Sequence, residues 1–94
     1  MESVVIRDNE TGEFRELEVD AVFIEIGLVA NSGFVNNLLE TNDRDEIIIN
    51  GNNETSKKGI WAAGDVTNIK DKQIVVASGE GASAALRVNE FLNI

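Results

Sequence analysis

The chain has 94 residues, of which 43% are apolar, enough to form one small hydrophobic core. Its 17 acidic and 8 basic residues give a formal charge of −9, and such a surface repels nucleic acid phosphates and anionic lipids. Because the chain has no Cys and no His, it offers no disulfide, no thiolate nucleophile, no sulfur-ligated metal site and no imidazole base.

The first 20 residues predict a β-hairpin. An extended apolar run covers 4–6, a stretch rich in turn-forming residues covers 8–12, and a second extended run covers 14–19. After Asp20 the sequence changes to a nearly continuous apolar run, Ala21–Gly27. Such a run predicts a strand that is covered on both faces, and we place a boundary between two structural units near Asp20.

The middle of the chain predicts short elements joined by polar loops. Apolar residues over 34–39 have helical spacing, and Asn31 or Ser32 is positioned to cap a short helix there. The polar stretch 40–46 predicts a loop. It is followed by Ile47–Ile49, which predicts a short strand.

The last third of the chain predicts one more strand and one long helix. The stretch 50–58 is so rich in Asn, Gly and charge that we expect only turn or surface there. Ile60–Ala63 then predicts a second buried strand. From Gln73 onward, apolar residues recur at three- and four-residue intervals, which predicts a long C-terminal helix with one apolar face.

A Gly-rich pattern inside the expected helix matches a nucleotide-binding fingerprint. Gly79–Ala84 fits G-x-G-x-x-G/A. A working fingerprint needs a second strand and an acidic residue about 20 positions further on, but only ten residues follow Ala84. We therefore reject it and place Gly79 and Gly81 in the first turns of the helix. Two interpretations of these small residues remain open, namely tight packing against a sheet and direct contact with a ligand.

Gly64 and Asp65 follow the strand expected at Ile60–Ala63. In open α/β sheets, ligands bind beyond the carboxyl ends of the strands, and a carboxylate placed there can accept hydrogen bonds from sugar-like hydroxyls. A simple turn explains the same two residues. On spacing alone, the turn is the interpretation that we favour.

Three segments carry a resemblance to a known family: Val19–Gly27 with Asn31, Thr55–Ser56 with Gly59–Asp65, and Lys72–Ala82. Together they resemble the C-terminal part of flavoproteins of the thioredoxin reductase type, and most closely the flavoprotein subunits of alkyl hydroperoxide reductases. The second segment is common to FAD-dependent pyridine-nucleotide disulfide oxidoreductases in general. The third is more selective for the thioredoxin reductase branch.

The resemblance implies an α/β fold, namely the C-terminal part of a two-dinucleotide-binding fold for FAD and NAD(P)H. Residues 1–20 would be the terminal hairpin of the NAD(P)H-binding domain, and 21–94 the C-terminal portion of the FAD-binding domain. Asp65 would hydrogen-bond the ribityl chain of FAD, while Gln73 and the backbone at Ile74 would approach the pyrimidine edge of the flavin. The expected cofactor-binding residues are Gly64, Asp65, Lys72, Gln73 and Ile74. We expect no catalytic residue and no metal ligand in the chain.

The same resemblance implies that the parent protein passes electrons from NAD(P)H through FAD to a disulfide. From there they would pass to a thioredoxin-like or peroxiredoxin-linked partner, and the family implies a homodimer. The fingerprints and the C-x-x-C pair of such enzymes would lie upstream of Met1, so we expect a fragment that is inactive alone. Without a signal peptide or a bilayer-length apolar run, the expected location is the cytoplasm.

Two alternatives remain open. In the first, the parent is a Cys-free relative that reduces ferredoxin or flavodoxin, or an NADH oxidase. In the second, the 94 residues form a non-enzymatic binding or oligomerisation module. The presence or absence of an upstream C-x-x-C pair separates the first alternative from the main prediction.

Overall fold

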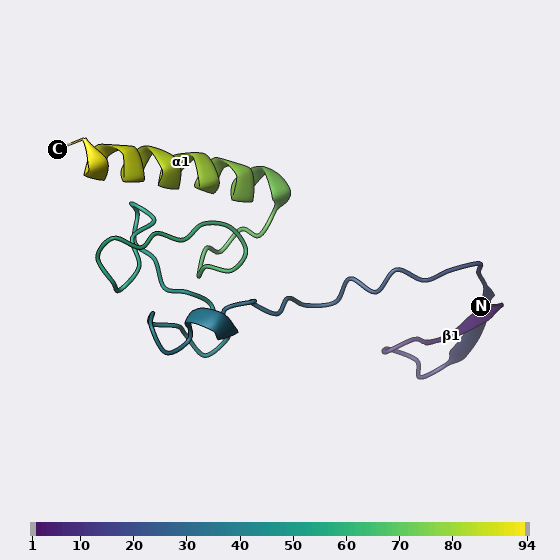
Figure 1. Cartoon of the computed structure of the whole chain (residues 1–94). Helices are drawn as coiled ribbons and strands as arrows, with labels where there is room; N and C mark the ends of the chain where they lie inside the picture. Colours follow the sequence, from purple (N-terminus) through teal and green to yellow (C-terminus); the bar gives the residue numbers. More distant parts are fainter. Residues whose placement is uncertain (1, 94) are drawn as a thin grey trace.

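The computed structural model describes residues 2–93 as a terminal hairpin, an extended segment and a loop-rich unit covered by one long helix (Figure 1). The molecule is elongated, measuring 62 × 25 × 24 Å along its principal axes. The predicted hairpin and the predicted long helix are both confirmed. The elements in chain order are β1 (Ser3–Arg7), β2 (Phe14–Glu18), the 3-10 helix η1 (Gly33–Val35) and α1 (Ile74–Leu92).

The hairpin is closed by a turn that the side chain of Asp8 organises. β1 and β2 pair antiparallel along all five residues of each strand. The Asp8 carboxylate accepts hydrogen bonds from the backbone N–H groups of Glu10 and Thr11, at 2.8 and 3.2 Å. Gly12 has φ +76°, a left-handed conformation that glycine adopts without steric cost. These local features explain why the sequence is sufficient to predict the hairpin.

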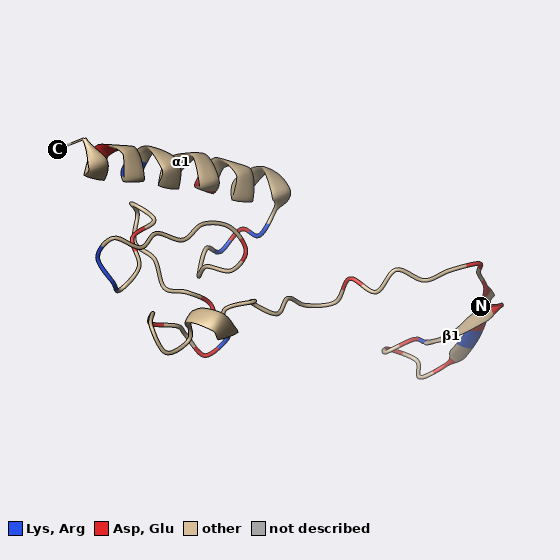
Figure 2. Cartoon of the chain, viewed as in Figure 1, with Lys and Arg blue, Asp and Glu red and all other residues tan. Residues whose placement is uncertain are grey.

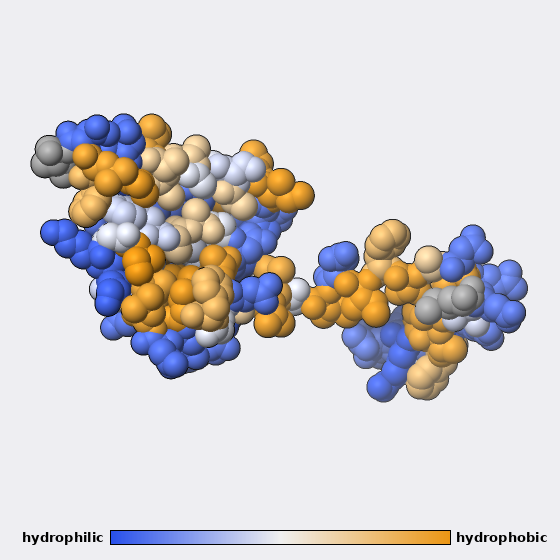
Figure 3. All heavy atoms as spheres, in the orientation of Figure 1, coloured by the Kyte–Doolittle hydropathy of each residue, from blue (hydrophilic) through white to orange (hydrophobic). Residues whose placement is uncertain are grey.

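The run Ala21–Gly27 is not a strand in this chain, so the prediction of a buried strand is wrong here. The segment is exposed, and Phe23 and Ile26 each keep 89% of their surface accessible. Figure 3 shows apolar side chains in the segment that links the hairpin to the larger unit. A strand needs a neighbour for its backbone groups, and β1 and β2 pair only with each other within residues 2–93. The apolar pattern therefore lacks the partners that would bury it.

The loop-rich unit has a small core in which polar side chains take a large part. Leu39 and Ile47 are its buried apolar residues within the described chain. Ser32 and Thr67 are also buried, and both hydroxyls donate to backbone carbonyls. Because these buried hydroxyls have partners, they hold the loops together at little desolvation cost.

The structure has only isolated β-bridges where short strands are predicted around Ile47 and Trp61. Ile47 bridges to Thr41 and to Thr67, and Trp61 bridges to Glu54. The buried strand predicted at Ile60–Ala63 and the strand predicted at Ile47–Ile49 are therefore wrong as regular strands. Each run is only three or four residues long and lies between turns, so no continuous ladder forms along it.

The helix predicted over 34–39 is only the single 3-10 turn of η1, followed by further turns. Ser32 occupies its N-terminal position without capping it, because the Ser32 hydroxyl donates to the carbonyl of Asp45 instead. Leu39 enters the core, but Phe34 is 87% exposed. The helical spacing is therefore correct for one apolar residue and misleading for the other.

Helix α1 lies along the loop-rich unit (Figure 1). The rings of Trp61 and Phe91 meet edge to face, with centroids 5.2 Å apart and planes at 69°. A Cβ atom built on Gly64 would lie 3.7 Å from that of Ala77, so the loop passes close to the helix there and an added methyl group would make ordinary van der Waals contact. The fingerprint-like stretch Gly79–Ala84 lies inside α1, as predicted.

Gly79 and Gly81 do not pack tightly against another segment within residues 2–93, so the first of the two interpretations of these glycines is not met there. A Cβ atom added at Gly79 or Gly81 would meet no heavy atom within 4 Å in that part of the chain. Both residues are exposed. The small face at these two positions is therefore open.

Candidate functional site

A tight turn places Asp65 at an exposed corner just before α1. Gly64 has φ +87°, which favours glycine, and its carbonyl accepts both the N–H and the hydroxyl of Thr67, at 3.0 and 2.7 Å. The side chain of Asp65 is exposed, and within residues 2–93 no group donates a hydrogen bond to its carboxylate. The turn predicted from spacing is therefore present, and it leaves the carboxylate free to accept a ligand hydroxyl.

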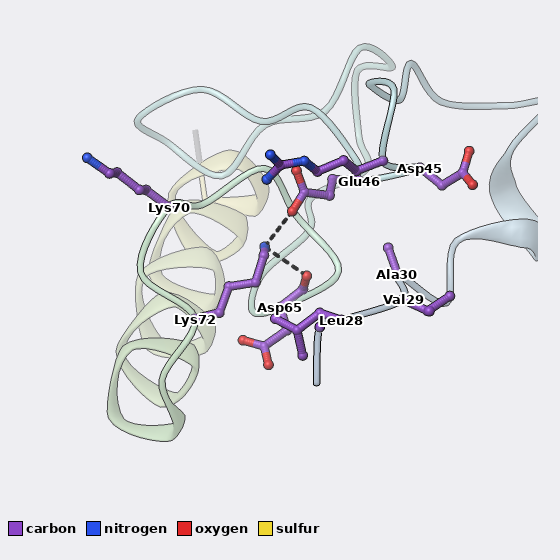
Figure 4. Close-up of a pocket in the computed structure, with 10 residues that line it drawn as sticks. Leu28, Val29, Ala30, Asp45, Glu46, Asp65, Lys70 and Lys72 are labelled. Atoms are coloured by element: carbon purple, nitrogen blue, oxygen red, sulfur yellow. Dashed lines mark hydrogen bonds and ion pairs between the residues drawn. The ribbon is translucent and has the colours of Figure 1, made fainter. Parts of the chain in front are cut away.

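Lys72 lies between this turn and a second loop. Its ammonium forms an ion pair with Glu46 at 2.9 Å and donates to the carbonyls of Asp65 and Thr67 at 3.0 and 2.6 Å. The Lys72 and Glu46 side chains are only 14% and 11% exposed. Figure 4 shows Lys72 directed toward Glu46 and Asp65, whereas Lys70 extends away from them. All three donors of the ammonium therefore have acceptors within the protein.

The carboxylate of Glu46 is held from both sides. The amide of Asn42 donates to one oxygen at 2.8 Å, and Lys72 pairs with the other. The hydrogen bond from Asn42, and next the one from Lys72, lower the pKa of Glu46 below its ordinary value, while burial opposes the shift. Glu46 is therefore a charged anchor for Lys72.

The start of α1 presents free backbone donors. Gln73 is the N-terminal capping residue, with an extended backbone and no capping hydrogen bond from its side chain. The first backbone bond into the helix runs from the N–H of Ala77 to the Gln73 carbonyl, at 2.9 Å. The preceding N–H groups, at 74–76, have no acceptor in the described part of the chain. Ile74 is 88% exposed, so this helix end is open to a group with negative charge.

Two of the five predicted site residues, Asp65 and Lys72, share a cavity of about 650 Å³. The other three, Gly64, Gln73 and Ile74, do not line it. Figure 2 shows that basic residues lie in the loop just before α1. The cavity is lined by 27–30, 44–46, Asp65, Lys70 and Lys72.

The sequence does not reveal the buried polar residues that are distant from the site in sequence but contribute contacts to the loops and the helix around it. Glu46 is one of 17 acidic residues and falls in a stretch predicted to be a polar loop, but it is buried against Lys72. Asn53 falls in a stretch predicted to be turn or surface, which gives no sign that its side chain is 2% exposed and that its amide donates to the carboxylate of Glu80 in α1. The φ of +60° at Asn53 matches the tolerance of Asn for left-handed conformations, the one local signal that it carries.

Within residues 2–93 no helix combines the length and the apolar character needed to cross a bilayer. The same residues contain no cluster of three or more acidic side chains arranged to hold a metal ion. The candidate site is the unit formed by Gly64, Asp65, Lys72 and the start of α1, because an exposed carboxylate and free backbone donors occur there.

Comparison with known proteins places the chain in one family. The family model described as pyridine nucleotide-disulphide oxidoreductase matches residues 2–81. An alkyl hydroperoxide reductase subunit of Staphylococcus aureus (strain NCTC 8325 / PS 47) is 46% identical over 85 residues, which is 90% of this chain and 17% of the relative. The corresponding subunit of Staphylococcus epidermidis (strain ATCC 12228 / FDA PCI 1200) is 45% identical over the same lengths. The chain thus spans about 17% of the length of these curated relatives.

Solved structures agree with the sequence match. Thioredoxin reductase from T. acidophilum superposes with a TM-score of 0.84 at 34% identity, covering 98% of this chain and 31% of that one. Lactococcus lactis thioredoxin reductase in the FR conformation gives 0.80 at 37% identity, covering 96% of this chain and 30% of that one. The chain belongs to the pyridine nucleotide-disulphide oxidoreductase family and is a segment of the thioredoxin reductase type of flavoprotein.

Proposed function

We propose that this chain supplies the FAD-contacting C-terminal segment of an NAD(P)H-dependent, thioredoxin reductase-like oxidoreductase. One observation carries the proposal: the unpartnered carboxylate of Asp65 and the free N–H groups at the start of α1 lie at the two ends of one short loop. A carboxylate accepts from ribityl hydroxyls, and free N–H groups suit the electron-rich pyrimidine edge of a flavin. The donors and acceptors present therefore fit the cofactor that the family uses.

In this proposal each predicted residue has a distinct part. Asp65 accepts a hydrogen bond from the ribityl chain, and Gln73 with the Ile74 backbone approaches the pyrimidine edge. Negative charge near a helix start is favoured by about 0.3–2 kcal/mol, which stabilises the reduced flavin. Gly64 allows the turn that presents Asp65, and Lys72 borders the same cavity. When bound, FAD supplies the electron-carrying step between NAD(P)H and a disulfide.

The division into domains is part of the same proposal. Residues 1–20 belong to the NAD(P)H-binding domain and 21–94 to the FAD-binding domain. The extended segment that links the described hairpin to the loop-rich unit supports a boundary near Asp20 (Figure 1). We further infer a cytoplasmic homodimer that delivers electrons to a thioredoxin-like or peroxiredoxin-linked partner. The names thioredoxin reductase and alkyl hydroperoxide reductase support the choice of partner.

A chimaera tests the FAD role directly. The chain would replace the matching segment of the S. aureus alkyl hydroperoxide reductase relative, and FAD affinity would be measured by fluorescence quenching. Asp65→Ala should weaken binding by about ten- to a hundredfold, because a lost hydrogen bond to a charged group is worth about 1.5–3 kcal/mol. Asp71→Ala, an exposed carboxylate on the same loop, is the control and should change affinity by less than about twofold. A folded chimaera in which Asp65→Ala binds FAD as tightly as the control would contradict the proposal.

A further inference from the structure

Lys72 makes contacts that differ from those of a ligand-binding lysine. Its ammonium has three donors, and the Glu46 carboxylate and the carbonyls of Asp65 and Thr67 accept them. A donor already paired with an acceptor of the protein is not free for a cofactor. The contribution of Lys72 to the site must then act through the backbone that it holds.

We propose that Lys72, anchored by Glu46, is a positioning residue that fixes the turn at Asp65–Thr67 and so aims the Asp65 carboxylate beside the start of α1. The proposal rests on the flavin-contacting role proposed above and assigns Lys72 an indirect part in it. Glu46 has no other assigned role. Its second oxygen accepts from Asn42, so the anchor is itself fixed.

The chain connectivity makes this arrangement effective. Lys72 directly precedes Gln73, the capping residue of α1, so its side chain joins the helix start to the turn at Asp65. The turn has its own local bond, from Thr67 to the Gly64 carbonyl, but among residues 2–93 no other local hydrogen bond ties it to the helix start. An exposed ion pair would contribute little here, whereas breaking a largely buried pair leaves an uncompensated charge.

Two roles for Lys72 give different results in one set of variants. If only the ion pair matters, exchanging the charges in the double variant E46K/K72E restores it. If the contacts to the two carbonyls matter, the exchange fails, because a Glu at position 72 cannot donate to carbonyls. Lys72→Met removes both kinds of contact while keeping the aliphatic stem. Glu46→Gln removes the charge but leaves Lys72 able to donate.

The test is hydrogen exchange of the full 94-residue chain, followed by mass spectrometry on peptides that cover the turn. The N–H of Thr67 bonds to the Gly64 carbonyl and that of Asn68 to the Ile47 carbonyl, so both report opening of the turn. Lys72→Met should speed their exchange by about ten- to a hundredfold, and Glu46→Gln by less. The double variant E46K/K72E should show the same hydrogen-exchange rates as Lys72→Met. Lys58→Met, at an exposed lysine that does not line the cavity, should match the parent.

The proposal would be overturned if the hydrogen-exchange rates of the turn were unchanged in Lys72→Met, or if the double variant E46K/K72E restored the parent rates. Equally fast hydrogen exchange throughout the parent chain would also overturn it. The same variants in the chimaera add a readout of function, because Lys72→Met should weaken FAD binding by about tenfold and Lys58→Met should not. Failure of the parent chimaera to bind FAD would refute the proposed function alone. Slow exchange that depends on Lys72 would still support the positioning of the turn.

Discussion

Asn53 and Glu80 lie 27 positions apart in sequence, yet the side-chain amide of Asn53 donates directly to the carboxylate of Glu80. The same amide also donates to the carbonyl of Ala62 at 3.2 Å. Asn53 is nearly fully buried, whereas Glu80 is half-buried on α1. One asparagine therefore joins two loops to the middle of the helix.

Two substitutions of Asn53 should destabilise the chain by different amounts, because they remove different contributions of this residue. Asn53→Gly loses the hydrogen bond to a charged group but keeps the left-handed backbone free of strain, so it should cost about 1.5–3 kcal/mol. Asn53→Ala adds steric strain at φ +60° and should cost about 1–2 kcal/mol more. Urea unfolding measures both changes. The exposed Asn52→Ala is the control, and equal stability of Asn53→Gly and Asn52→Ala would contradict the role of the Glu80 contact.

The stability contributed by Glu46 should depend on pH. Its pKa in the folded chain is lowered, first by Asn42 and then by Lys72, so its contribution is complete above the ordinary pKa of 4.5 and disappears as pH falls through the lower folded value. Glu46→Gln should therefore be less stable than the parent at neutral pH, with a difference that shrinks as the pH falls below 4.5. Thermal unfolding at several pH values measures this difference. Glu40→Gln, an exposed carboxylate, is the control, and a difference that stays constant with pH would argue against the ion pair.

The isolated chain should self-associate through the extended apolar segment. Phe23 and Ile26 are 89% exposed, and an uncovered apolar run with unpaired backbone groups tends to pair with copies of itself. Light scattering should show dimers or larger species. Replacing both residues with Ser should lower the apparent mass, while Phe34→Ser, at a residue 87% exposed outside the segment, should have a smaller effect. A parent chain that remains monomeric at high concentration would contradict this prediction.

The isolated chain should show no NAD(P)H-dependent reductase activity. It has no Cys, so no thiol is available to exchange electrons with a disulfide. The measurement mixes catalytic amounts of the chain with FAD, NADPH and a disulfide dye, and compares turnover with that of free flavin. Turnover proportional to the amount of chain would contradict the expectation.

Local sequence patterns are sufficient to predict an element whose stabilising contacts lie between residues close together in the chain. The hairpin is predictable because Asp8 and Gly12 close its turn within a few positions. Helix α1 is predictable because its apolar spacing recurs over 19 residues. The prediction for the run Ala21–Gly27 fails, because an apolar strand pattern specifies the need for partners but not their presence.

The sequence by itself determined the hairpin, the long helix, the Gly64–Asp65 turn and, through its motifs, the family. Only the tertiary structure decided that Glu46 anchors Lys72 and that Asn53 joins a loop to α1. These contacts join residues that are distant in sequence, and a single carboxylate or amide carries no periodic signal of its partner. The physical reason is that periodicity records which face of an element is apolar, whereas the pairing of buried polar groups depends on how the loops meet in space.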